Sequence, residues 1–225
     1  MKKYLLAALF ACACSLTGCI TIEYEEEQPV DNVVEGNGEV SPEAADVKEQ
    51  IDVEIVPCVG SEWGGVGVLI KNGSPYTIGE MEVQVLFYDS EDNIIDTGSD
   101  GHDVVLPGST VVSYMETPDE YARYDYKLNI DVEANGGYKN HAANIDIKTN
   151  AGENCVIIQF TNNAGVDIDE IEYAVVFYKG DKIVDVTNGI DVYDVPTGET
   201  IVEECSTWNV DYDRYEVYLN QAHTF

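Results

Sequence analysis

The residues able to act as acids, bases or nucleophiles form no recognisable catalytic pattern. His102, His141 and His223 fall in segments expected to be loops or the chain end, and none recurs in both halves of the chain. The sequence contains no G-x-S-x-G, H-E-x-x-H or Cys–His arrangement. With 43 Asp and Glu, two neighbouring carboxylates carry no glycosidase signal. We predict no catalysis and no cofactor, since an enzyme would need a cleft that gathers His102 or His141 with acids.

One acidic run resembles a calcium loop only in its spacing. Residues 89–100 place acids at several of the positions that such a loop uses. Ile94, however, stands where the loop needs glycine, and Asp100 stands where it needs a bidentate Glu. We therefore predict a hairpin turn followed by a strand. No zinc site is predicted either, because the cysteines are widely spaced and lack neighbouring histidines.

Aromatic residues provide the one ligand hypothesis at the level of single side chains. Trp63 precedes an apolar run, and Trp208 lies close to Tyr212. Flat rings on loops suit the apolar faces of sugars, so these three residues form a predicted stacking site. The alternative is that both tryptophans close the ends of a hydrophobic core. Their exposure to solvent distinguishes the two interpretations.

Net charge excludes several partners. The formal charge is −32, from 11 Lys and Arg against 43 Asp and Glu. Phosphate backbones and anionic lipids would repel such a chain, so we predict no nucleic-acid binding and no electrostatic docking to membranes. Hydrophobic residues make up 44% of the chain and include 15 Tyr, enough to build a folded core.

The first residues predict where the protein resides. A basic start at residues 1–3 leads into an apolar stretch too short to span a bilayer, which ends in Leu16-Thr17-Gly18-Cys19. This pattern resembles the lipobox of bacterial lipoproteins, in which cleavage precedes a cysteine that then carries lipid. The resemblance implies a signal peptide over 1–18 and an extracytoplasmic protein anchored in the lipid bilayer through acylated Cys19. The alternative is an ordinary secretory peptide in which Cys19 is incidental.

The segment after the anchor is predicted to be a tether. Residues 19–50 carry many acids against the single Lys48, with glycines and prolines that interrupt regular structure. Such a segment buries too little apolar surface to offset its ordering entropy. We predict a disordered acidic linker spanning roughly 30 Å as a flexible coil.

The rest of the chain contains one unit twice. An offset of about 90 residues aligns Asn72 with Asn162, and the order of matches is kept to the end, through Phe87-Tyr88 with Phe177-Tyr178 and Arg123-Tyr124 with Arg214-Tyr215. Two copies of this length indicate tandem domains rather than a solenoid. We predict domains at 51–133 and 144–225, joined by a connector at 134–143.

Each repeat has the period of a half-buried strand. Residues 81–87 and 171–177 alternate apolar and other side chains, and turn residues separate further short runs. Six or seven strands in about 80 residues predict an all-β fold of two tandem Ig-like antiparallel β-sandwich domains. Residues 120–126 and 211–217 resemble the tyrosine corner of immunoglobulin-like domains, with Tyr124 and Tyr215 as the corner residues.

Together these features resemble the FxLYD-type Ig-like domains of bacterial lipoproteins. The motif stretch reads Val85-Leu86-Phe87-Tyr88-Asp89 in the first repeat and Val175-Val176-Phe177-Tyr178-Lys179 in the second. The leading Phe is lost in both, and the final Asp in the second. Since the resemblance lies in core positions, it implies fold and location but no active site.

Three cysteines remain beyond Cys19 outside the cytosol, where thiols tend to oxidise. In an Ig-like layout Cys155 opens the second strand and Cys205 closes the fifth, so these two form the predicted disulfide. The alternative is that Cys58, Cys155 and Cys205 are all buried thiols. The function predicted from the sequence is a non-catalytic interaction or scaffold module at the cell surface, whose partner is a surface protein or a glycan. The alternative function is carbohydrate binding through the loop aromatics.

Overall fold

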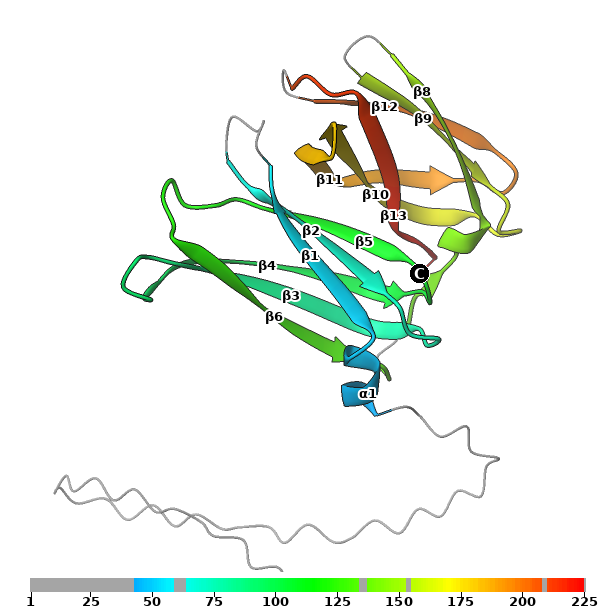
Figure 1. The fold of residues 1–225 in the computed structure, drawn as a ribbon. Helices are drawn as coiled ribbons and strands as arrows, with labels where there is room; N and C mark the ends of the chain where they lie inside the picture. The colour runs from blue at the N-terminus through cyan, green and yellow to red at the C-terminus, as the bar shows by residue number, and fades with distance from the viewer. Residues whose placement is uncertain (1–42, 59–63, 134–136, 153–154, 208–209, 225) are drawn as a thin grey trace, which may run out of the picture. The chain divides into compact units, whose positions relative to one another are not determined.

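The computed structural model describes residues 43–58, 64–133, 137–152, 155–207 and 210–224, which all belong to one compact unit. Antiparallel strands dominate these residues (Figure 1). Residues 1–42, with the predicted signal peptide and most of the predicted linker, lie outside the described residues. Within the described ranges, no helix is long and apolar enough to cross a membrane.

The first repeat forms a β-sandwich of two three-stranded sheets with the strand orders β1-β2-β5 and β4-β3-β6. All pairs of neighbouring strands are antiparallel. A short helix, α1 (Ala44–Lys48), precedes the first strand. The strands are β1 (Ile51–Pro57), β2 (Val66–Asn72), β3 (Ile78–Tyr88), β4 (Ile94–Val105), β5 (Thr110–Met115) and β6 (Arg123–Asp131).

The second repeat has the same strand order, β12-β9-β8 in one sheet and β11-β10-β13-β7 in the other. The connector supplies the extra strand β7 (Lys139–Asn140) and a 3-10 turn, η1 (Ala142–Asn144). These sheets confirm the predicted all-β fold of two Ig-like antiparallel β-sandwiches. The other strands are β8 (Ile145–Ala151), β9 (Cys155–Asn162), β10 (Ile168–Lys179), β11 (Lys182–Val195), β12 (Thr200–Ser206) and β13 (Arg214–Thr224).

Each sandwich has a hydrophobic core of its own, built on the alternation seen in the sequence. Every second residue of β3 and of β10 points inward and is fully buried: Met81, Val83, Val85 and Phe87 in the first, and Ile171, Tyr173, Val175 and Phe177 in the second. Side chains along a strand point alternately to the two faces of a sheet, so this pattern assigns one face of each strand to the core.

A buried asparagine performs the same structural role in each repeat. The side-chain Nδ2 of Asn72 donates to the carbonyl of Val105 (3.2 Å), and that of Asn162 donates to the carbonyl of Val195 (2.9 Å). Each Oδ1 accepts the backbone N–H two residues ahead, at 3.1 and 2.9 Å respectively. Both asparagines therefore tie the turn after one strand to the end of another. The repeat extends to individual hydrogen bonds.

The two sandwiches pack on each other through a third hydrophobic cluster. Its buried members come from both repeats: Cys58 and Val112 from the first, and Ala174, Val176, Tyr178, Ile183 and Val186 from the second. Gly67 on β2 is required there, because a Cβ at this position would lie 2.8 Å from Cγ2 of Val186. The sheet β1-β2-β5 and the sheet β11-β10-β13-β7 therefore each bury side chains on the face that points away from their own core.

Asn220 joins the backbones of the two sandwiches inside this interface. The N–H of Val112 donates to its Oδ1 (2.8 Å), and its Nδ2 donates to the carbonyl of Val112 (2.9 Å) and to Oε1 of Glu172 (2.9 Å). The register between β10 and β13 shifts at this residue, since Glu172 pairs with Gln221 and the next residue pairs with Leu219. A β-bulge therefore directs Asn220 into the first sandwich.

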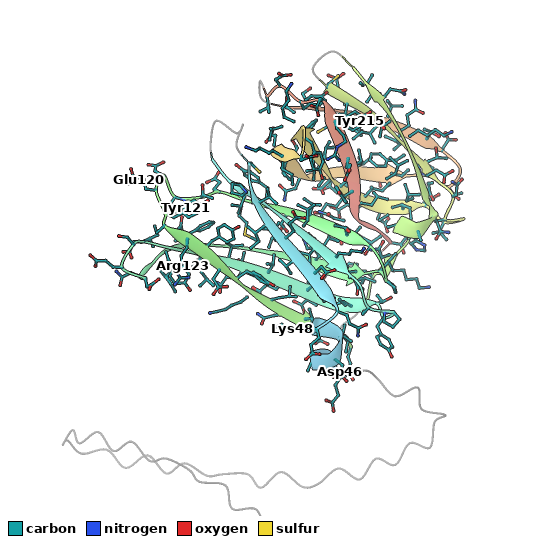
Figure 2. The ribbon with its side chains drawn as sticks, in the orientation of Figure 1. Asp46, Lys48, Glu120, Tyr121, Arg123 and Tyr215 are labelled. Atoms are coloured by element: carbon teal, nitrogen blue, oxygen red, sulfur yellow. The ribbon has the colours of Figure 1, made fainter. Side chains whose placement is uncertain are left out.

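The start of the first domain differs from the predicted boundary. Residues 44–48 form α1, and Val47 is fully buried in the core of the first sandwich. Lys48, labelled in Figure 2, donates its Nζ to the carbonyl of Leu128 on β6. The predicted linker over 19–50 thus includes an ordered end, because one apolar side chain and one long cation suffice to dock a single helical turn.

Candidate functional site

Most of the site residues predicted from the sequence lie outside the described residues. The lipidation site, the lipobox and both tryptophans of the stacking hypothesis remain predictions for this reason: Cys19, Leu16, Thr17, Gly18, Trp63 and Trp208. The described part of the chain contains the remaining predicted residues, which are Tyr212, the two corner tyrosines and the cysteines.

Tyr212, the described member of the predicted stacking site, lines a small pocket. The pocket has a volume of about 320 Å³ and contains two Tyr and two Asp: Asp211, Tyr212, Asp213 and Tyr215. The ring of Tyr212 packs on Phe177 at 4.9 Å between centroids. Its hydroxyl donates to the carbonyl of Cys155 (3.2 Å), and burial raises the pKa of Tyr212. The side chain is thus held firmly while it forms part of a polar surface.

The first repeat has a comparable but smaller pocket. It is lined by Asp89, Ser90, Glu120, Tyr121 and Ala122 and has a volume of about 280 Å³. The ring of Tyr121 packs on Phe87 at 5.2 Å, as that of Tyr212 packs on Phe177. Figure 2 labels Glu120 and Tyr121 on the segment that leads into β6. Both repeats therefore place a tyrosine and acids before their last long strand.

The predicted tyrosine corner is not formed by Tyr124. A corner tyrosine is buried and donates to the backbone a few residues upstream. Tyr124 instead is 36% exposed and donates its hydroxyl to the carbonyl of Ile55 on β1 (3.1 Å). In the second repeat Tyr215 packs edge-on against Tyr212, 6.4 Å between centroids. Tyr124 lies opposite the fully buried Phe87, but β6 is an edge strand and the ring of Tyr124 stays partly exposed.

The strand register disfavours the predicted disulfide. Cys155 and Cys205 are buried free thiols on the adjacent strands β9 and β12, but Cys155 pairs with Ser206 and Cys205 pairs with Val156. Directly opposite residues share a face of a sheet and successive residues alternate. The two thiols therefore point to opposite faces, Cys205 into the core of the second sandwich and Cys155 towards Glu204.

The third cysteine lies in the interface between the sandwiches. Cys58 is 5% exposed and belongs to the shared cluster. Burial, and secondarily the charge of Asp185, raises the pKa of Cys58 to about 12. A thiol with this pKa stays protonated at neutral pH and is unreactive. Cys58 therefore acts as a small apolar side chain.

The side chains of two of the three histidines form structural contacts, and the third, His141, donates its backbone N–H to the carbonyl of Ala222 (2.6 Å). His102 is 4% exposed, and its Nε2 lies 2.9 Å from Oγ of Ser113 in the interior of the first sandwich. Burial lowers the pKa of His102, against the opposing effect of Asp100 and Asp103. Nε2 of His223 lies 3.2 Å from Oε2 of Glu170. The structure does not gather these residues in the pockets described above.

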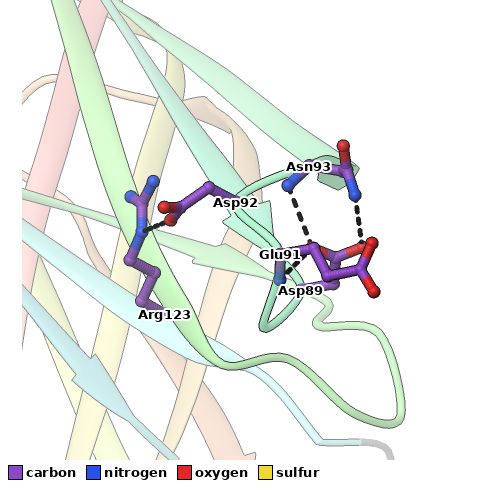
Figure 3. Close-up of polar contacts among 5 residues, drawn as sticks. All are labelled: Asp89, Glu91, Asp92, Asn93 and Arg123. Carbon is purple, nitrogen blue, oxygen red and sulfur yellow. Dashed lines mark hydrogen bonds and ion pairs between the residues drawn. The ribbon is translucent and has the colours of Figure 1, made fainter.

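The acidic run at residues 89–100 forms the predicted hairpin turn between β3 and β4. Oδ1 of Asp89 accepts the backbone N–H groups of Glu91 (2.8 Å) and Asn93 (2.9 Å), and its Oδ2 accepts Nδ2 of Asn93 (3.0 Å) (Figure 3). Asp92 is paired with Nε of Arg123 at 2.8 Å. The hydrogen bonds from Asn93 lower the pKa of Asp89. Among the described residues no group of acids, His or Cys could hold a metal ion.

A larger groove lies where the two sandwiches meet. It has a volume of about 650 Å³, and apolar side chains dominate its walls. The turn between β4 and β5 supplies one wall, η1 supplies the end, and β13 supplies the other wall: Leu106, Pro107, Gly108, Ser109 and Thr110; Ala142 and Ala143; and Val217, Tyr218 and Leu219. We call this set the junction groove.

Sequence reasoning missed the junction groove because its walls come from both repeats and the connector. The half-buried Leu106 and Leu219 lie far apart in the chain and belong to different domains. One signal was available, namely that the connector carries the small pair Ala142-Ala143 just before β8 where the first repeat has the long side chains of Lys48-Glu49 just before β1. Only the packing of the sandwiches shows that these small residues leave an open space.

Comparisons with known proteins identify no relative. No family model matches the chain, and no curated protein matches it. Among solved structures the chain is similar to red sea bream transglutaminase, with a TM-score of 0.24 and 10% identity over 76% of this chain. The matched region spans only 29% of that transglutaminase. A likeness at this level carries no argument about function.

Proposed function

We propose that this protein is a non-catalytic interaction module, displayed at the outer face of a bacterial membrane by lipid on Cys19, and that the junction groove is its binding site. The observation that carries this proposal is the groove itself, about 650 Å³ of largely apolar space. Sites of this kind are concave, apolar and preferentially formed at domain interfaces. The lipid anchor follows from the lipobox resemblance at Leu16-Thr17-Gly18-Cys19.

The groove is supported by rigid walls. Asn220, the residue after Leu219, is bonded to both backbone polar groups of Val112 and is 3% exposed. The shared hydrophobic cluster holds the outer faces of the two sheets together. A partner entering the groove would therefore meet preorganised surfaces, and little ordering entropy would oppose binding.

Site-specific crosslinking on living cells tests the proposal. A photoreactive amino acid is placed at Pro107, an exposed residue of the groove wall, and in a control at Val202, which is 57% exposed on β12. We expect a discrete adduct at Pro107 that is missing at Val202. Identical patterns at the two positions would refute the groove as the binding site. In parallel, Cys19→Ala should move the protein from the membrane fraction to the soluble fraction.

The pocket around Tyr212 favours a second candidate function, carbohydrate binding. Tyr212 and Tyr215 offer ring surfaces, and Asp211 and Asp213 offer acceptors for sugar hydroxyls. Titration of the protein with cell-wall polysaccharides, followed by calorimetry, tests this function with Tyr212→Ala as the variant. The equivalent Tyr121→Ala serves as a matched control, because it removes the same ring contact from the first repeat. Heat that saturates for the wild type and is lost only in Tyr212→Ala supports glycan binding.

A further inference from the structure

The strand β13 has an open edge next to the junction groove. One side of β13 pairs with β10 along most of its length, from Arg214 to His223. On the other side β7 pairs only with His223 and Thr224. Among the strands that the structure describes, none covers the remaining edge from Arg214 to Gln221. Val217 and Leu219, which line the groove, belong to this open stretch.

The chain itself already uses this edge to bind an extended segment. The N–H of His141 donates to the carbonyl of Ala222 (2.6 Å), and the N–H of Ala222 donates to Oδ1 of Asn140 (3.2 Å). The backbone polar groups of Ala222 therefore point away from β10 and are satisfied by the connector. The connector then turns away at η1, so the pairing stops after two strand residues. The edge is competent for strand pairing beyond the point where the connector leaves it.

Three other edge strands carry aspartates that bind backbone N–H groups of the same strand. At four places on β4, β6 and β11, all of them edge strands, a backbone N–H donates to the carboxylate of the residue before it. The pairs are Thr97 with Asp96, Gly101 with Asp100, Tyr126 with Asp125, and Val186 with Asp185. A bound N–H and a negative charge both discourage pairing with another strand. On β13 the acid equivalent to Asp125 is Glu216, and its carboxylate is bound by Arg214, Tyr178 and Tyr218 instead.

Near Leu128 the equivalent strand of the first sandwich is also contacted by a helix. Lys48 of α1 donates to the carbonyl of Leu128 on β6, and Val47 fills the space beneath. Leu219 is the residue of the second repeat that matches Leu128. Near it the segment before β8 has only Ala142 and Ala143, whose short side chains line the groove. The second repeat thus leaves an open groove beside Leu219, where the first repeat places Lys48 on the carbonyl of Leu128.

We infer that the junction groove binds an extended segment of a partner protein, which adds a strand to the open edge of β13. This inference rests on the proposed function of the groove. The partner's backbone pairs with β13, and an apolar side chain enters between Leu106 and Leu219. Lys or Arg residues flank this side chain, because the chain carries 43 acids against 11 basic residues and attracts cations. At 3.3 Å per residue the open edge accommodates roughly eight residues.

A peptide selection tests this inference on the full-length chain. A phage-displayed library of random 12-residue peptides is panned against the immobilised protein and, in parallel, against Ala143→Lys, which adds a long cationic side chain to the wall of the groove. Ala122→Lys is the matched control, because it adds the same charge at an exposed alanine outside the groove. We expect enriched peptides with alternating apolar residues and basic ends. Their affinity should fall at least tenfold in Ala143→Lys and stay unchanged in Ala122→Lys, while thermal unfolding shows that both variants fold.

A chemical change in the peptide separates strand pairing from simple occupation of the groove. The best peptide is synthesised with N-methyl groups on alternate backbone nitrogens, in both registers. Strand addition predicts at least a tenfold loss in one register only, because just one set of N–H groups faces β13. If Ala143→Lys abolishes binding but neither methylated peptide loses affinity, strand addition is overturned while the groove remains a binding site. No enrichment over Ala143→Lys would also overturn strand addition, and the crosslinking at Pro107 then decides on the groove independently.

Discussion

Replacing Asn220 with alanine should destabilise the protein more strongly than any replacement of an exposed asparagine. The side chain binds both the N–H and the carbonyl of Val112, which is fully buried. The variant leaves these two groups without their partner inside a hydrophobic interface. Each buried group left without a partner costs about 1–3 kcal/mol, so the two together predict a loss of about 2–6 kcal/mol in the free energy of unfolding. That is a large share of the stability of a typical protein, about 5–15 kcal/mol.

Urea unfolding followed by circular dichroism measures this loss. Asn129→Ala is the control, because Asn129 is exposed and its Nδ2 contacts only Oε2 of Glu82, at 3.2 Å. We expect that variant to stay within about 0.5 kcal/mol of the wild type. Asn220→Asp tests the contact with Glu172, because it places a second carboxylate beside that residue, whose pKa is already raised by burial. This variant should lose more unfolding free energy at pH 7.5 than at pH 5, where a proton shared by the two carboxylates relieves their repulsion.

A single outcome would refute this reasoning. If Asn220→Ala lost less than about 1 kcal/mol, the amide would not be buried between the sandwiches in solution. The junction groove would then lack the rigid walls on which its preorganisation depends. A normal loss for Asn220→Ala together with a pH-independent Asn220→Asp would instead refute only the contact with Glu172.

Three further predictions concern buried side chains. Burial lowers the pKa of His102 in the folded protein below the 6.5 of the unfolded chain, so protonation at acid pH favours the unfolded state. His102→Gln should therefore lose less stability than the wild type between pH 7.5 and 5.5 in urea unfolding. Equal losses in the variant and the wild type would contradict this prediction. Val47→Ala should cost about 2 kcal/mol, since Val47 is fully buried in a core, and no change in the urea midpoint would show that α1 does not dock. The intact mass of the non-reduced protein should not rise on reduction, because Cys155 and Cys205 point to opposite faces, whereas a gain of about two mass units would demonstrate the bridge.

The alternation of apolar and polar residues along the sequence was sufficient to predict much of the fold. The alternation of Met81, Val83, Val85 and Phe87 specifies one inward face, since a strand has a period of two and only one registration buries these side chains. The repeat also carried structural information, as Asn72 and Asn162 form matching hydrogen bonds. The turn at Asp89 followed from its position between two apolar runs and from the ability of aspartate to bind nearby N–H groups.

Predictions failed where the outcome depended on which residues lie opposite each other. The disulfide was expected because two strand ends meet, but a shift of one residue in register places the thiols of Cys155 and Cys205 on opposite faces. Tyr124 was expected to form a tyrosine corner, yet its hydroxyl donates to the carbonyl of Ile55 on β1, a strand of the facing sheet. The linker was expected to continue to residue 50, whereas Val47 finds a place in the core.

The sequence by itself determined the all-β class, the two repeats and the inward face of their strands, because these depend on periodicities that neighbouring residues carry. Only the tertiary structure decided that the two sandwiches share a hydrophobic cluster, that Asn220 joins them, and that a groove remains beside the open edge of β13. These features arise from contacts between residues about a hundred positions apart, such as Val112 and Asn220. Close packing decides such contacts, and packing depends on the shape of both surfaces at once.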